Sequence, residues 1–244
     1  VAHHGALIVR NLLEAGDVRR ILEGMHRAQA QLDRPDGDDS DDESASWYQR
    51  YPASEGVNMR SMVQGRGGIW MADSPANTAL ILDLLTSRGV IAAVAGHFGE
   101  RPCFSLQKST LRRLEPTFRL ATWHQDGAFL GSDVRTMNVW VALSPCGGDR
   151  PTPGLEVVPK RVDEILSLEG GLFPNSIAPE AVEEVAADAP AVCPEFEPGD
   201  GILFDERFLH RTYFHANMSE DRYALECWLF APSHRSPDYL PFLV

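Results

Sequence analysis

The chain has 244 residues, of which 43% are hydrophobic and 23% are charged, and its formal net charge at pH 7 is −13. This composition is ordinary for a globular protein, and a chain of this length can bury a core without disulfide staples. The negative charge argues against a nucleic-acid partner, because phosphate binding needs a basic surface, and it also disfavours anionic membranes. We therefore expect a single domain over residues 1–244 that binds neither nucleic acid nor membrane.

The four cysteines are far apart in the sequence, and no Cys-x-x-Cys pair occurs among them. This spacing argues against a structural zinc site and against a disulfide framework, so we interpret them as reduced, mostly packing thiols. No apolar run is long enough to span a bilayer, and no signal peptide is visible. These features favour a cytoplasmic protein, either a monomer or a homodimer.

Two helical patterns dominate the first hundred residues. Residues 5–10 are apolar and β-branched and predict a strand, whereas residues 12–31 place apolar side chains along one helical stripe. A second helical stretch covers residues 76–98, in which Gly89 weakens or breaks the helix. Residues 33–46 are acidic with almost no apolar residue, and predict a mobile solvated loop or, alternatively, a lid that orders over a substrate.

From Cys103 onward, short apolar segments alternate with Gly, Pro and Asp turns, which is typical of a sandwich or jelly roll. The predicted strands are residues 103–114, 117–124, 134–143, 154–159, 191–197, 201–204 and 222–231. A predicted helix at residues 162–168 and a Gly/Pro-rich loop interrupt the series. The sequence thus places helices first and β-structure second.

One residue separates His124 from Asp126. In an extended backbone the side chains of residues i and i+2 point to the same face, so an imidazole and a carboxylate can reach one metal ion. Alone, the pair is weak evidence, because a chain with 8 histidines and many aspartates produces such a pair by chance.

A distant predicted hairpin supplies a second histidine. His210 follows the Pro-Gly-Asp200 turn and an apolar strand, and the next strand begins at Arg222. Two histidines and one carboxylate are the set that holds non-haem Fe(II) and leaves positions open for substrate and O2. The Arg222 guanidinium suits a carboxylate of a co-substrate, and Thr212 on the same face adds a hydroxyl donor. His215 competes with His210, but the step from the turn favours His210.

Together these segments resemble the phytanoyl-CoA dioxygenase-like family of Fe(II)/2-oxoglutarate oxygenases. The stretches that carry the resemblance are Gly5–Leu13, Trp123–Asp126, Asn138–Leu143, Gly154–Pro159, Pro198–Thr212 and Arg222. The chain departs from the family at Pro159-Lys-Arg-Val162, where relatives usually have Pro-Gly-Ser-His. The resemblance implies a mainly β fold with flanking α: a double-stranded β-helix (jelly-roll, cupin-like) core with N-terminal helices packed on one sheet.

The resemblance also implies roles for residues of this chain. Fe(II) is expected on His124, Asp126 and His210. 2-Oxoglutarate is expected on Arg222 and Thr212, and Gln107 is a looser candidate for the same pocket. Phe129, Asn138 and Trp140 are candidate substrate contacts.

In the reaction so implied, O2 and 2-oxoglutarate yield succinate, CO2 and an oxidant that attacks a nearby C–H bond of a small molecule. Hydroxylation of a specialised metabolite or an acyl compound is the expected outcome, and desaturation, epoxidation or cyclisation are the alternatives. A non-catalytic jelly-roll protein that binds a metal or ligand is a further alternative. A zinc hydrolase on the same ligands would leave Arg222 without a purpose. Arginines such as Arg112 serve either an anionic substrate or the surface, and we favour the surface.

Overall fold

The computed structural model describes residues 1–33, 46–49, 63–65, 67–117, 121–131, 133–169, 175–235 and 241–244. Most of the predicted acidic loop at 33–46 lies outside these residues, as does part of the predicted strand at 117–124. The account below concerns the described residues.

The two predicted N-terminal helical regions are helical. Strand β1 (Ala6–Val9) leads into α1 (Ala15–Leu32), where the Glu14 side chain and Asp17 form a capping box. The second region is split into α4 (Pro75–Ser87) and α5 (Val90–Phe98). Gly89 lies between them with a φ of 74°, in the left-handed region that favours glycine, so the helix breaks where the sequence predicts.

No single helix in the described part of the chain is long and apolar enough to cross a membrane. The bent pair of α4 and α5, which meet at 71°, passes that test only when the two helices are taken together.

The prediction of a helix at residues 162–168 is wrong. The backbone there bonds to other segments instead of to itself: the Leu166 N–H donates to the Gln125 side chain, and the Glu164 carbonyl accepts from it. Leu168 forms an isolated β-bridge with Ile177. The helix in this region comes later, as α7 (Pro179–Ala186), with a proline in its first turn.

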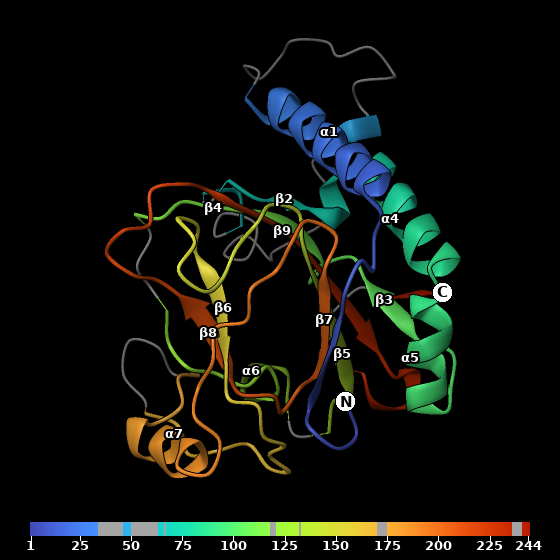
Figure 1. Ribbon diagram of the computed structural model, residues 1–244. Coiled ribbons are helices and arrows are strands. Elements are labelled where there is room, and N and C mark those ends of the chain that lie inside the picture. Colours follow the sequence, from blue (N-terminus) through green and yellow to red (C-terminus); the bar gives the residue numbers. More distant parts are fainter. Residues whose placement is uncertain are drawn as a thin grey trace.

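The remaining elements are mostly short antiparallel strands (Figure 1). They are β2 (Ile69–Trp70), η1 (Met71–Asp73), β3 (Cys103–Ser105), β4 (Thr110–Leu114), α6 (Gly127–Leu130), β5 (Thr136–Ala142), β6 (Gly154–Val157), β7 (Gly201–Asp205), β8 (His210–Tyr213), β9 (Arg222–Phe230), η2 (Pro232–His234) and β10 (Pro241–Leu243). The large sheet has the order β1-β7-β5-β9-β3-β10, with β4 pairing β9 and β2. Strands β6 and β8 form a separate two-stranded sheet. The predicted strand at 191–197 is reduced to isolated bridges at Val192 and Phe196.

The two faces of the large sheet have different surroundings. Figure 1 shows α1, α4 and α5 along one side of the large sheet and β6 and β8 on the other. Alternate residues of β5 and β9, such as Val139 and Cys227, join the buried side chains of the helices in one apolar cluster. The intervening residues, such as Asn138 and Glu226, face a cavity on the opposite side. The helices therefore cover one face and leave the other for a site.

Candidate metal centre

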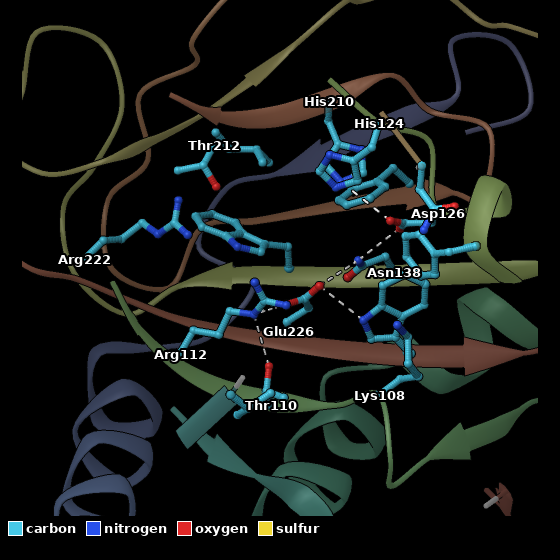
Figure 2. Close-up of a pocket in the computed structure, with 17 residues that line it drawn as sticks. Lys108, Thr110, Arg112, His124, Asp126, Asn138, His210, Thr212, Arg222 and Glu226 are labelled. Carbon is cyan, nitrogen blue, oxygen red and sulfur yellow. Dashed lines mark hydrogen bonds and ion pairs between the residues drawn. The ribbon is translucent and has the colours of Figure 1, made fainter. Parts of the chain in front are cut away.

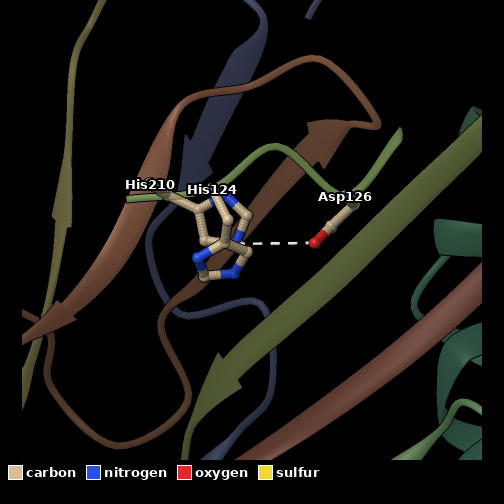
Figure 3. Close-up of side chains that lie close together, drawn as sticks. All are labelled: His124, Asp126 and His210. Carbon is tan, nitrogen blue, oxygen red and sulfur yellow. Dashed lines mark ion pairs between the residues drawn. The ribbon is translucent and has the colours of Figure 1, made fainter. Parts of the chain in front are cut away.

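Main-chain pairing brings the two predicted histidine ligands together. His124 and His210 form an isolated antiparallel bridge, with N···O distances of 3.0 and 3.1 Å between their backbones. Asp126 directly precedes α6, whose first residue, Gly127, donates its N–H to the Glu206 carbonyl. One donor atom from each of His124, Asp126 and His210 lies within 4.8 Å of the others (Figure 3). Within the described residues, this is the single cluster of histidine, cysteine and acidic side chains with metal-binding spacing.

Backbone carbonyls orient both imidazoles. Nδ1 of His124 lies 2.9 Å from the Thr122 carbonyl oxygen, and Nδ1 of His210 lies 2.9 Å from that of Phe208. A ring nitrogen that faces a carbonyl carries the proton, so in each ring the Nε2 lone pair is left for a ligand. Nε2 of His210 lies 3.8 Å from Oδ1 of Asp126. This is the arrangement that metal-ligating histidines require.

Burial disfavours the charged forms of the side chains in the cluster. It lowers the pKa of His124 to about 4 and raises the pKa of Asp126 to about 7, so both groups favour their neutral forms. A divalent cation supplies the positive charge that stabilises the Asp126 carboxylate in this environment. The donor set, two neutral imidazoles and one carboxylate, fits Fe(II) and leaves positions open for further ligands.

Gln125, the residue between the two ligands, anchors the segment through hydrogen bonds on the side away from the cavity. It is fully buried; its amide donates to the carbonyls of Arg207 at 2.6 Å and Glu164 at 3.0 Å, and its Oε1 accepts from the Leu166 N–H at 2.8 Å. Because His124 and Asp126 point the other way, Gln125 fixes the backbone that carries both. Sequence reasoning missed this role, although a polar spacer in an extended segment is a signal for it.

A cavity of about 410 Å³ opens in front of the triad (Figure 2). Most of its wall consists of strand residues spaced two apart, as expected for side chains on one face of a sheet. The lining residues are Val63, Lys108, Thr110, Arg112, His124, Asp126, Phe129, Asn138, Trp140, Leu155, Asn175, Phe204, His210, Thr212, Arg222, Glu226 and Trp228.

Arg222 lies in this cavity as a buried cation, 3% exposed. Its Nη1 donates to the Gly154 carbonyl at 2.8 Å, its guanidinium carbon lies 5.5 Å from the centre of the Trp140 ring, and its Nε has no hydrogen-bond partner. No described carboxylate pairs with it, since the neighbouring Asp221 bonds to Arg113 instead. Burial lowers its pKa to about 10, so it is charged at neutral pH. A buried, uncompensated guanidinium is a site for an incoming carboxylate.

A polar network behind Asp126 was not foreseen. Nδ2 of Asn138 lies 3.4 Å both from Oδ2 of Asp126 and from Oε1 of Glu226, and Trp228 donates to the same Oε1 at 3.2 Å. Arg112 pairs with the other oxygen of Glu226. Burial alone would raise the pKa of Glu226, but Arg112 and these donors bring it below its usual value. Residues 222, 226 and 228 are an even number of positions apart along β9, so the sequence already indicated that their side chains share one face of the strand.

Most of the predicted contact residues lie where a ligand would meet them. Thr212, Phe129, Asn138 and Trp140 all line the cavity. Gln107 is half-buried in the turn before β4 and is not among the lining residues, so its role in co-substrate binding stays a prediction.

Two basic residues also belong to the wall of the cavity. Lys108, next to Gln107, lines the cavity, and so does Arg112, which we expected at the surface. Arg112 pairs with buried Glu226 while its own side chain stays 42% exposed, so it lies both at the surface, as expected, and at the wall of the cavity.

The sequence model of the phytanoyl-CoA dioxygenase (PhyH) family matches residues 1–224. The chain belongs to the PhyH family. No curated protein matches the chain.

Solved structures share the fold of this PhyH-family chain at low sequence identity. AviO1 from Streptomyces viridochromogenes Tue57 is 17% identical, with a TM-score of 0.59 and coverage of 98% of this chain and 94% of AviO1. EctD from S. alaskensis, solved with 2-oxoglutarate and 5-hydroxyectoine, is 16% identical, with a TM-score of 0.60 and coverage of 96% and 74%. The carbocyclase SnoK from nogalamycin biosynthesis, described as non-heme and alpha ketoglutarate dependent, is 17% identical, with a TM-score of 0.57 and coverage of 94% and 80%. The predicted mainly β, jelly-roll fold class is confirmed.

Membership of the PhyH family fixes the class of enzyme. The chain is a non-haem Fe(II)/2-oxoglutarate-dependent oxygenase, and Fe(II), 2-oxoglutarate and O2 are its cofactors and co-substrates. The His-Asp-His cluster and the buried arginine fit these groups.

Proposed function

We propose that His124, Asp126 and His210 hold Fe(II), that Arg222 and Thr212 hold the far carboxylate of 2-oxoglutarate, and that the enzyme oxidises a C–H bond of a small molecule. The observation that carries this proposal is Arg222, a buried cation without an acidic partner among the described residues, in the cavity that the triad also lines. A hydrolase or a simple metal carrier has no use for such a cation.

Each residue of the site has a separate task in this proposal. Fe(II) with bound 2-oxoglutarate and O2 supplies the oxidant, with succinate and CO2 as products. The carbonyls of Thr122 and Phe208 hold the imidazoles with Nε2 towards the ion. Asn138 donates to Oδ2 of Asp126 and leaves Oδ1 on the side of His210.

The co-substrate end of the cavity is prepared in advance. The bond from Arg222 to the Gly154 carbonyl and its packing on Trp140 fix the guanidinium before a carboxylate arrives. Preorganisation of this kind lowers the entropy cost of binding and positions the keto acid end of the co-substrate at the metal.

We propose hydroxylation of a specialised metabolite or an acyl compound as the outcome. The cavity offers room for a small molecule beside the co-substrate, with aromatic faces at Phe129, Trp140 and Trp228. Cyclisation is a second candidate, because SnoK has the same fold and is described as a carbocyclase. Both outcomes use the same residues around the metal.

Succinate release from 2-oxoglutarate in the presence of Fe(II) and O2 tests the proposal, because it can be measured without the natural substrate. We expect turnover in the wild-type protein, none in Asp126→Ala, and a large loss in Arg222→Met. Arg113→Met is the matched control, since Arg113 pairs with Asp221 outside the cavity. Full turnover in either site variant would refute the assigned roles.

A further inference from the structure

A row of four polar side chains links Asp126 to the outer wall of the cavity. Figure 2 shows Arg112, Glu226, Asn138 and Asp126 in this order, each next to the one before it. Nδ2 of Asn138 lies 3.4 Å from Oδ2 of Asp126 and 3.4 Å from Oε1 of Glu226. Arg112 pairs with Oε2 of Glu226, and it is the one partly exposed member of the row. The row therefore extends from the metal cluster towards solvent.

The two carboxylates fix the orientation of the Asn138 amide. The nitrogen of a primary amide carries two N–H donors, so it can serve two acceptors at once. The opposite orientation of the amide would turn its carbonyl oxygen towards Asp126 and Glu226, and the carboxylate oxygens would repel it. Glu226 therefore contributes to this orientation as Asp126 does, although it does not belong to the metal cluster.

The other end of the same amide is left unsatisfied. Oδ1 of Asn138 is buried and has no hydrogen-bond partner among the described residues. A buried acceptor without a partner destabilises the folded protein, and an apolar side chain of similar size would avoid that cost. Packing alone therefore does not explain an asparagine at this position. The donor that it offers to Asp126 does.

Glu226 is held by residues of neighbouring strands. Trp228 donates Nε1 to Oε1 of Glu226 at 3.2 Å, and Arg112 of β4 holds the other oxygen. In the register of the sheet, Asn138 of β5 is paired with Trp228, and Thr110 of β4 is paired with Glu226. Side chains that are diagonal to such pairs remain within reach of one another. The network is thus built on three adjacent strands, which position side chains more precisely than loops do.

We propose that Glu226 is a positioning residue of the metal centre and that it acts through Asn138. Glu226 fixes the Asn138 amide, and the amide holds Oδ2 of Asp126 and leaves Oδ1 for the ion. This inference rests on the proposed function, because that function places Fe(II) on Asp126. Hydrogen-bond partners behind metal ligands orient the ligands and tune metal affinity. In this role, Glu226 affects metal binding without contacting the metal.

Mn²⁺ binding in the absence of 2-oxoglutarate measures this role apart from catalysis, and the electron paramagnetic resonance signal of free Mn²⁺ gives the dissociation constant. Asn138→Leu removes the donor at similar side-chain volume. We expect it to weaken Mn²⁺ binding by at least about tenfold, as is usual when a partner behind a metal ligand is lost. Asn138→Ala serves if thermal unfolding of the metal-free protein shows that the leucine variant does not fold.

Thr136→Val is the matched control for Asn138→Leu. Thr136 lies two residues earlier on β5, is 1% exposed, and also has a buried side-chain oxygen without a partner among the described residues. The valine variant removes this oxygen at similar volume and leaves Asp126 and its donor in place. Its dissociation constant for Mn²⁺ should stay within about twofold of the wild-type value.

Glu226→Asp tests whether Glu226 acts through Asn138. This change keeps the negative charge but withdraws the carboxylate by one methylene, so lost charge cannot explain a change in Mn²⁺ affinity. We expect binding to weaken by at least about threefold in the wild-type background and by less than about twofold in the Asn138→Leu background, where the contact is already absent. An effect that does not pass through Asn138 would be the same in both backgrounds.

The proposal is overturned if Asn138→Leu binds Mn²⁺ within about twofold of the wild type, if Thr136→Val loses as much affinity, or if Glu226→Asp has no effect or the same effect in both backgrounds. Failure of the proposed function is seen separately. In that case Asp126→Ala would bind Mn²⁺ as tightly as the wild type, before any change at Asn138 or Glu226 is compared.

Discussion

Both histidine ligands are oriented by the same kind of local contact between Nδ1 and a backbone carbonyl. In each, Nδ1 faces the carbonyl of the residue two positions earlier, Thr122 for His124 and Phe208 for His210. The orientation therefore depends on backbone conformation and not on a neighbouring side chain that a single mutation removes. The backbone in turn is held by the bridge between the two histidines and by Gln125.

Gln125→Ala tests how much the site depends on this anchoring. The change leaves two carbonyls and one N–H without their buried partner, so we expect a loss of about 2–4 kcal/mol in the free energy of unfolding and weaker metal binding. Chemical denaturation and a Mn²⁺ titration measure the two effects. Gln29→Ala, which removes a single part-buried bond to Gly67, is the control and should cost less than half as much. Equal losses in both variants would show that Gln125 has no special role.

Strand β9 shows how one element serves both the core and the site. Leu225, Cys227 and Leu229 belong to the cluster that contacts the helices, whereas Glu226 and Trp228 face the cavity. A shift of one residue in the register of β9 would exchange these faces and bury the wrong set.

The turn before β7 is a second element under tight constraint. Gly199 has a φ of 96°, and a Cβ there would lie 2.2 Å from the Leu13 carbonyl oxygen, in the segment that leads into α1. Gly199→Ala therefore has both a strained backbone and a clash, and we expect it to destabilise the protein by at least about 3 kcal/mol or to prevent folding.

Gly99→Ala is the control for the strain alone, because Gly99 also has a positive φ, of 76°, but open space around the added Cβ. Its cost should stay near 1 kcal/mol. Thermal unfolding of both variants makes the comparison, and similar melting temperatures would contradict the clash.

Across the whole molecule, the features that could be predicted from the sequence are those that depend on local residue patterns. The two N-terminal helical regions and the break at Gly89 follow from spacing and residue type, whereas the roles of the triad and Arg222 depended also on the resemblance to the PhyH family. The far wall of the cavity did not follow, because the positions of Lys108 and Glu226 depend on how β4, β5 and β9 pair. The helix predicted at 162–168 failed for a related reason, since its backbone partners lie far away in the sequence.

The site is a product of the whole fold. Its ligands come from the segment before α6 and from β8, and its arginine comes from β9, so the triad and Arg222 meet only when both sheets are assembled. Ligands that bind the folded state alone stabilise it by mass action. Fe(II) and 2-oxoglutarate should therefore both bind to, and stabilise, the same assembled cavity.

The anaerobic visible spectrum with Fe(II) and 2-oxoglutarate tests this assignment most directly. A charge-transfer band should appear in the wild-type protein and saturate with 2-oxoglutarate. It should be lost in Asp126→Ala, and Arg222→Met should need at least about thirtyfold more 2-oxoglutarate, because truncating one partner of a buried charge pair costs about 2 kcal/mol or more. A wild-type protein without the band, or an Arg222→Met variant with unchanged affinity for 2-oxoglutarate, would contradict the assignment.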